Sequence, residues 1–337
     1  MVDSTSSISS RGRRSRADEP GDSSLDAQGA EEHFGGNEAP LRHAFTVDVE
    51  DYFQVSAFDK LIPRSQWEGY ESRVVGNTQR ILRLLEARGV RATFFILGWV
   101  AERYGDLVRE IHRAGHEVAS HGYWHYLVYS QTPDEFRADV RQSREILEDL
   151  IGEPVTAYRA PSFSITRRSL WALEILAEEG YRVDSSIVPA RHDRYGIPSA
   201  RRDIHRLSTP AGTLWEFPPT VVRLAGANVP VGGGGYFRLY PLSWTCRCLR
   251  RLEEARRQPF MFYIHPWEID PDQPRLRFGS RVARWRHTVN LARTEAKLAA
   301  LLERFPFGRM CDALALAPIE EPVPAEQLRG RLAVSHA

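Results

Sequence analysis

Residues 116–125 read His-Glu-Val-Ala-Ser-His-Gly-Tyr-Trp-His, an apolar segment that runs into a pair of histidines. Its first half, 116–120, predicts a buried strand. His121 and His125 stand four residues apart just beyond the strand, so both rings can point at one ion. The same spacing recurs at His112 and His116, but Gly115 between them predicts a helix C-cap at which the two rings diverge. The spacing alone therefore does not define a metal site, and other strand ends must supply the remaining groups.

Further strands and helices alternate along the chain on both sides of this segment. Strands are predicted at 44–47, 90–97, 116–120, 156–159, 181–184 and 260–264, and helices at 77–88, 106–114, 132–150, 166–179, 241–257 and 282–305. This alternation predicts an α/β fold with a largely parallel sheet or barrel. Residues 185–235 are less regular, and the glycine run 232–235 is interpreted as a flexible loop. One domain is expected over 41–317, with a disordered segment at 1–40 and a loose tail at 318–337.

Composition limits the classes of partner. The 337 residues carry a net charge of +1, which gives no global attraction to nucleic acid or to an anionic membrane. Three cysteines, odd in number, indicate reduced thiols. The longest apolar run, 92–100, is too short to span a bilayer, and no hydrophobic segment follows the arginines at 11–16. A cytoplasmic protein without a transmembrane segment is expected, and its oligomeric state is left open.

Ionisable side chains follow the predicted strands, and in parallel α/β folds the carboxyl ends of the strands form the active face. Each has a structural explanation of its own: carboxylates cap turns, an arginine can be a buried ion-pair partner, and a histidine can be a hydrogen-bonded core residue. What favours function is that all of them fall at one edge of one predicted sheet. The residues concerned are Asp48, Glu50, Asp51, His121, His125, Arg159, Asp184 and His265.

Taken together, these segments resemble the polysaccharide deacetylases of carbohydrate esterase family four, which share the NodB homology domain. Five motif regions match in order across residues 41–316. Residues 46–53 (TVDVEDYF) and 159–164 (RAPSFS) are similar to the branch associated with exosortase and exopolysaccharide loci. The resemblance implies a distorted (β/α) barrel and a divalent metal, usually Zn2+, with Co2+ or Ni2+ as alternatives.

The resemblance also implies a role for each matching residue. His121 and His125 match the metal histidines, and Asp48 matches the catalytic base. Arg159 matches the arginine that orients the base, and His265 matches the general acid. Asp184 matches an aspartate that tunes the acid.

Two positions depart from the family pattern. The usual metal aspartate follows the base directly, but Val49 stands there and cannot ligate, so Glu50 or Asp51 must substitute, with a slight preference for Asp51. The tyrosine of the family's Arg-x-Pro-Tyr motif is replaced by Ser162, whose backbone N–H can still reach an oxyanion.

The function expected is a hydrolase that removes N-acetyl groups from an amino-sugar polysaccharide or its lipid-linked precursor, in exopolysaccharide biosynthesis. Two imidazoles and a carboxylate leave metal positions open for water and substrate. Two alternatives stay open: an amidohydrolase of a cyclic ureide or imide such as allantoin, and a catalytically silent glycan-binding protein. A narrow closed pocket favours the former, and an open groove lined by Trp124, Trp267 or Tyr236 favours a glycan.

Overall fold

The first strand is an inner strand of a mostly parallel sheet. In the computed structural model, which describes residues 42–256, 258–276 and 280–329, β1 (His43–Val49) is buried along its whole length. It pairs in parallel with β10 (Met261–Ile264) on one side and with β2 (Thr93–Ile96) on the other. The predicted disordered segment 1–40 lies outside the described residues. Apolar residues on both faces of β1 are what a strand covered on both sides requires.

The strand order is β10-β1-β2-β3-β4-β5-β7-β6-β12, with β11 (Phe307–Gly308) paired to the start of β1. The ladders are parallel except between β6 and β7. The remaining strands are β3 (Glu117–Ser120), β4 (Ala157–Tyr158), β5 (Val183–Asp184), β6 (His205–Thr209), β7 (Gly212–Glu216) and β12 (Val323–Pro324). The prediction of an α/β fold of the distorted-barrel type is confirmed. Its parallel strands end at one edge, where the polar residues gather.

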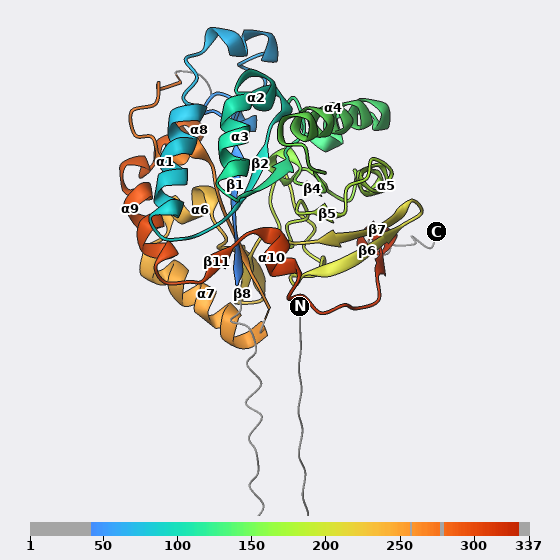
Figure 1. The fold of residues 1–337 in the computed structure, drawn as a ribbon. Helices are drawn as coiled ribbons and strands as arrows, with labels where there is room; N and C mark the ends of the chain where they lie inside the picture. The colour runs from blue at the N-terminus through green and yellow to red at the C-terminus, as the bar shows by residue number, and fades with distance from the viewer. Residues whose placement is uncertain (1–41, 257, 277–279, 330–337) are drawn as a thin grey trace, which may run out of the picture. The chain divides into compact units, whose positions relative to one another are not determined.

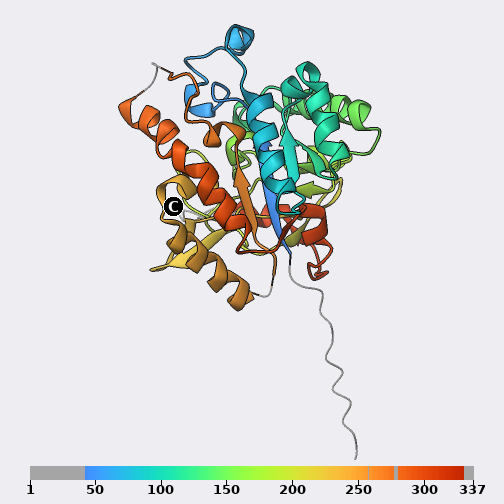
Figure 2. The ribbon, with the colours of Figure 1, turned by 60° about the vertical axis from the view of Figure 1, so that its left-hand side comes forward.

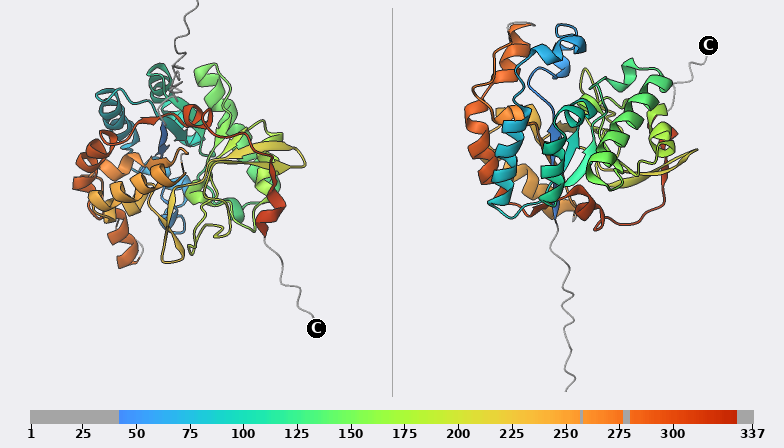
Figure 3. Two further views of the ribbon diagram at one scale, coloured as in Figure 1. Left: turned by 90° about the horizontal axis from the view of Figure 1, so that it is seen from below. Right: turned by 45° about the horizontal axis from the view of Figure 1, so that its top comes forward.

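Helices cover both sides of this sheet. Figure 1 shows α1 (Val74–Glu86), α7 (Leu242–Arg256) and α9 (Leu291–Leu302) on the left, with α4 (Pro133–Ile151) and α5 (Trp171–Glu178) on the right. The right-hand view of Figure 3 shows the same two groups of helices on the two sides of the sheet. Figure 2 brings the left-hand side of Figure 1, which includes α9, towards the viewer. Shorter helices are α2 (Gly98–Arg103), α3 (Gly105–Arg113), α6 (Gly234–Leu239), α8 (Arg281–Thr288) and α10 (Met310–Leu314). None of the described helices is long and apolar enough to cross a membrane.

Helix α4 shows how local sequence sets an element's limits. Thr132 accepts a hydrogen bond from the backbone of Glu135, whose side chain returns to Thr132, and Pro133 occupies the first turn. Gly152 ends the helix in a left-handed conformation with φ 72°. The helix start at residues 132–135, with proline at the first position, is the signal that predicted this helix, and the capping box and Gly152 fix its two ends.

Three predictions about irregular segments are wrong. The expected helix at 282–305 is divided into α8 and α9 by Asn290, which adopts φ 57°. The glycine run is not a flexible loop, because Gly234 begins α6 and a Cβ on Gly233 would lie 1.9 Å from the carbonyl oxygen of Tyr263. Residues 323–329 are not loose, since β12 pairs with β6 and Leu328 is buried.

Residues 185–235 also contain two antiparallel hairpins, β6–β7 and β8 (Val221–Leu224) with β9 (Ala227–Pro230). All three cysteines are free, as predicted.

Candidate metal and catalytic site

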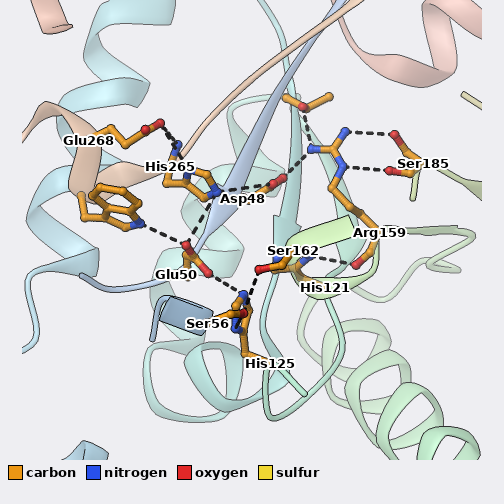
Figure 4. A network of polar contacts seen from close by, with 12 residues as sticks. Asp48, Glu50, Ser56, His121, His125, Arg159, Ser162, Ser185, His265 and Glu268 are labelled. Atoms are coloured by element: carbon orange, nitrogen blue, oxygen red, sulfur yellow. Dashed lines mark hydrogen bonds and ion pairs between the residues drawn. The ribbon is translucent and has the colours of Figure 1, made fainter. Parts of the chain in front are cut away.

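Three side chains from two strand ends converge on one point. Glu50 follows β1, and His121 and His125 follow β3; one ligand atom from each lies within 4.8 Å of the others. All three are buried. Figure 4 shows Glu50 pointing towards His125 on one side and His265 on the other. This is the set of donors, two imidazoles and a carboxylate, that the sequence places at strand ends.

His121 is held in one orientation by the backbone. Its Nδ1 lies 2.8 Å from the carbonyl oxygen of Arg159, to which it donates, so Nε2 is left with a lone pair. Burial lowers the pKa of His121 to about 4, against the attraction of Asp48 and Glu50. The ring is therefore neutral near pH 7, the form in which imidazole binds a metal.

His125 stands in a constrained loop. Its φ of 56° is left-handed, a conformation that costs a β-carbon residue about 1–2 kcal/mol. Arg64 donates to the carbonyl oxygens of Trp124 at 2.6 Å and of His125 at 2.9 Å. Asp139 accepts the backbone N–H groups of Tyr123 and Trp124. These contacts hold the histidine loop in place from both sides.

Glu50 meets the imidazoles directly. Its Oε2 lies 2.6 Å from His125 Nε2, and its Oε1 accepts from Trp267 Nε1 at 3.0 Å. Burial would raise the pKa of Glu50, but the nearby His125 and His265 outweigh it and hold the pKa below its usual value. The carboxylate is thus ionised in a buried setting.

Asp51 lies elsewhere, and the preference for Asp51 over Glu50 is corrected. Its Oδ2 accepts from Ser72 Oγ at 2.7 Å and from the backbone N–H groups of Arg73 and Val74, at the start of α1. Its Oδ1 accepts from the N–H of Tyr52. Its side chain therefore caps the start of α1, whereas that of the preceding residue, Glu50, lies at the histidines.

Asp48 and Arg159 form a buried ion pair. Nη1 of Arg159 donates to Asp48 Oδ1 at 2.5 Å and to Thr46 Oγ1 at 2.8 Å. The other guanidinium nitrogens donate to the hydroxyl and carbonyl oxygens of Ser185. The fork of Arg159 thus fixes both its own position and that of the aspartate, as the arrangement predicted from the sequence requires.

His265 lies across the site from His125. Its Nε2 is 3.6 Å from Glu50 Oε1 and 3.8 Å from Asp48 Oδ2, and its Nδ1 is 3.2 Å from Glu268 Oε2. Burial alone would lower the pKa of His265, but Glu50, Glu268 and Asp48 together raise it to about 9. The imidazole is therefore charged at neutral pH and has a proton to give.

The carboxylate that contacts Nδ1 of His265 is Glu268 and not Asp184, which corrects the looser match made from the sequence. Asp184 accepts a hydrogen bond from Ser186 and lies opposite Glu216 in the ladder of β5 with β7. Glu268 is held in turn by Arg238, whose Nε donates to it at 2.8 Å. His265 is thus supported by a residue of the loop that follows it: Glu268 lies three residues further along the chain, in η5 (Pro266–Ile269).

Ser162 lies at the rim of the same site. Its φ is 51°, and its hydroxyl is 2.8 Å from that of Ser56, which lies 3.5 Å from His125 Nδ1. Backbone held in the left-handed region at two successive residues, Ser162 and Phe163, is of the kind found at functional sites. The oxyanion role of the Ser162 N–H stays a prediction.

The donor set fits a metal ion. Glu50 Oε2 is buried and has no hydrogen-bond partner in the described part of the chain, although it lies 2.6 Å from His125 Nε2. A buried carboxylate oxygen without such a partner is available to a cation. Imidazole nitrogen and carboxylate oxygen in this number suit Zn2+ with a coordination position left open.

Several residues of the site were missed from the sequence. Glu268 and Arg238 hold His265, Ser185 holds Arg159, and Arg64 holds the histidine loop. Only Glu268 left a signal: in His265-Pro266-Trp267-Glu268, an acid three residues after a strand-end residue is the pattern of a capping box, which the structure contains.

Comparison with known proteins identifies the first part of this arrangement. Residues 64–183 match the family model described as polysaccharide deacetylase. The chain carries a polysaccharide deacetylase domain. Residues 185–315 match a second model, described as a domain of unknown function (DUF3473). The deacetylase match includes His121, His125 and Arg159, whereas His265, Glu268 and Arg238 fall in the second match.

Two curated relatives of the polysaccharide deacetylase domain are named as peptidoglycan deacetylases. A peptidoglycan-N-acetylglucosamine deacetylase of Bacillus cereus is 36% identical over 98 residues, which cover 29% of this chain and 36% of that protein. A peptidoglycan deacetylase of Helicobacter pylori is 30% identical over 109 residues, covering 32% and 36%. The chain therefore spans about a third of the length of these relatives.

Solved structures show the same fold over more of the chain. One assigned to the polysaccharide deacetylases, from Mycobacterium smegmatis, has a TM-score of 0.54 and 20% identity, covering 84% of this chain and 94% of that one. The Puue allantoinase has a TM-score of 0.53 and 15% identity, covering 86% and 97%. At these identities the likeness concerns the fold, which both carry.

Proposed function

We propose that this chain is a metal-dependent deacetylase that removes N-acetyl groups from an amino-sugar polysaccharide or its precursor. The observation that carries the proposal is the cluster of Glu50, His121 and His125, with protonated His265 near both Glu50 and the buried carboxylate of Asp48. The domain match and the relatives named peptidoglycan deacetylases support an amino-sugar polymer as the substrate class.

Glu50 and the two histidines would hold the ion, with Zn2+ the first choice for nitrogen and oxygen donors. When bound, such an ion polarises a carbonyl and lowers the pKa of water towards neutrality. Trp267 supports this arrangement, since its N–H fixes Glu50 Oε1 and leaves Oε2 to the cluster.

The chain's own residues then divide the proton transfers. Asp48, oriented by Arg159, accepts a proton from the attacking water, whose oxygen joins the acetyl carbon. His265 gives its Nε2 proton to the sugar nitrogen as the C–N bond breaks, because an amine leaves poorly as an anion. The products are acetate and a free amine. The N–H of Ser162 would stabilise the oxyanion, by about 3 kcal/mol for one such donor.

The proposal is tested by acetate release from an N-acetylglucosamine oligomer by the zinc- or cobalt-loaded protein. His125→Ala and Asp48→Asn are expected to abolish release. Matched controls are His112→Ala and Asp106→Asn, which change a histidine and an exposed aspartate of α3, outside the site. Undiminished release by both site variants would overturn the mechanism.

The same assay separates the alternatives. Allantoin, offered in a parallel assay, should yield no product, because only the likeness in fold to the allantoinase favours a cyclic ureide. Trp267 is buried against His265 and His287 and does not serve as a wall of either an open groove or a narrow pocket. The silent glycan-binding alternative requires a site without a carboxylate, which Glu50 argues against. Participation in exopolysaccharide synthesis at the cytoplasmic face stays a prediction, and cell fractionation that finds the protein outside would contradict it.

A further inference from the structure

Two buried acids that the proposed reaction does not use lie side by side in the sheet. Asp184 of β5 and Glu216 of β7 are neighbours in a parallel ladder, and both are fully buried. Each has one oxygen with a donor: Asp184 Oδ1 accepts from Ser186 Oγ at 2.5 Å, and Glu216 Oε1 accepts from the N–H of Ile187 at 3.0 Å. The other two oxygens, Oδ2 and Oε2, find no donor in the described ranges.

Those two oxygens belong to side chains that are partners across the sheet, because Asp184 lies opposite Glu216 in the register of β5 with β7. Two carboxylates cannot form a hydrogen bond unless one carries a proton. Two ionised carboxylates on adjacent strands would also repel in a setting that excludes water. A proton between Asp184 Oδ2 and Glu216 Oε2 removes this repulsion and gives both unpartnered oxygens a partner.

The groups that face the pair do not supply a compensating charge. The guanidinium of Arg159 is engaged by Asp48, and Tyr158, beside Asp184 in the ladder with β4, has its pKa raised by burial. His205 stands opposite Glu216 in the ladder with β6, and burial lowers its pKa, so it is neutral. Because these neighbours offer the pair no free positive charge, the two acids are expected to carry one negative charge between them and not two.

We propose that Asp184 and Glu216 share one proton in an O–H···O hydrogen bond. We propose also that this acid pair positions the two segments that hold Arg159, residues 159–160 and 185–186. The positioning role rests on the proposed function; the shared proton does not. Both residues lie outside the segment that matches the deacetylase model, which ends at residue 183.

The contacts show how the acid pair reaches the site. Ser186, bound to Asp184, accepts the N–H of Ala160 at 2.8 Å, the residue directly after Arg159. Ser185, next to Asp184, accepts from Arg159 through its hydroxyl at 3.1 Å and its carbonyl at 3.3 Å. Asp184 and Glu216 are thus positioning residues that act through the serines on the guanidinium that orients Asp48.

Amide substitutions test the shared proton. In Glu216→Gln, the amide oxygen can still accept from Ile187, so the NH2 group faces Asp184 and replaces the shared proton; Asp184→Asn does the same from the other side. At pH 5, each single variant should keep its melting temperature within about 2 °C of wild type, whereas the double variant places two NH2 groups face to face. Its loss should exceed the sum of the single losses by at least about 3 °C. Additive effects would overturn the proposal.

The pH dependence of stability provides a second measurement, should the double variant fail to fold. Burial raises the pKa of Asp184 to about 6 and that of Glu216 well above its ordinary value. An acid with a raised folded pKa contributes stability below its unfolded pKa of about 4.5, and loses it as pH rises through the folded pKa. The amide introduced by Glu216→Gln does not titrate. The melting temperature of this variant relative to wild type should therefore rise by about 3 °C or more between pH 5 and pH 8; a constant difference would contradict the shared proton.

Activity tests the positioning role separately. Glu216→Gln should retain wild-type kcat, whereas Glu216→Ala, which removes both hydrogen bonds, should lower kcat at least about tenfold with little change in KM. Equal loss in both variants would show a role other than positioning through the pair. If wild type itself releases no acetate, the proposed function fails while the melting measurements still report on the proton.

Discussion

Glu268→Gln is expected to make the proposed deacetylase fail at alkaline pH. Glu268 lies 3.2 Å from Nδ1 of His265 and is a fully buried carboxylate whose charge helps keep that imidazole protonated. Glutamine keeps the shape and one acceptor but removes the charge. Arg238 retains three backbone acceptors, the carbonyls of Arg286, His287 and Val289, so the variant is expected to fold.

The magnitude follows from the pKa of His265, which burial lowers and the nearby carboxylates raise to about 9. Loss of one opposite charge within about 4–6 Å lowers such a pKa by roughly 1–3 units. With a shift of about 2 units, the protonated fraction at pH 8 falls from about 90% to about 10%, and the rate falls about ninefold. Because the folded pKa lies above the unfolded value of 6.5, the stability from this charge is present below pH 6.5 and lost as pH rises through about 9.

The assay is the pH profile of kcat/KM for acetate release between pH 6 and pH 10. The alkaline limb should move down by about 1–3 units in Glu268→Gln and stay in place in Glu253→Gln. Glu253 is a matched control, since it pairs with His43 at 3.0 Å, at the other end of β1. An alkaline limb that is unchanged in a folded Glu268→Gln protein would refute the assignment of Glu268 as the support of the acid.

Three other substitutions have definite expectations. Arg159→Lys should lower kcat at least about tenfold, because an ammonium cannot bond Asp48 and Ser185 together as the guanidinium fork does; equal kcat would contradict this. Trp267→Phe removes the N–H that fixes Glu50 and should weaken zinc binding about 10-fold to 100-fold, measured by competition with a chelator. Asp51→Asn should leave zinc binding unchanged and cost about 1–3 kcal/mol in the free energy of unfolding, because it weakens the cap of α1; lost zinc would contradict this.

Much of the fold follows from periodicity and end signals. The strand at 260–264 and the helix at 132–150 coincide within a residue or so with β10 and α4, because continuous apolar runs and capping boxes are local properties. The division of the last long helix was missed because Asn290 tolerates the left-handed conformation that breaks it, and nothing in the helical periodicity on either side requires the break.

The same distinction between local signals and long-range contacts applies to the residues of the site. Asp48, Arg159, His121 and His125 each stand at or shortly after the end of an apolar strand, so their convergence follows from parallel topology alone. Whether Glu50 or Asp51 faces the histidines depends on the turn after β1, and the two acids there receive different donors: Trp267 for Glu50, the start of α1 for Asp51. Those donors are 217 and 22–23 residues away in the chain, beyond any local pattern.

The partner of His265 could not be chosen from the sequence for a similar reason. Asp184 and Glu268 both stand near strand ends, but only Glu268 lies in the short 3-10 helix that His265 precedes. Only the register of β5 with β7 reveals that Asp184 lies opposite Glu216.

Bound zinc in matched acid variants tests the central claim most directly. Wild type, Glu50→Gln and Asp51→Asn would be purified, dialysed against the same limiting zinc concentration and analysed for metal per chain. We predict about one zinc in wild type and Asp51→Asn, and little in Glu50→Gln, since a neutral amide is a poor substitute for the carboxylate beside His121 and His125. Full zinc content in Glu50→Gln together with loss in Asp51→Asn would contradict the account.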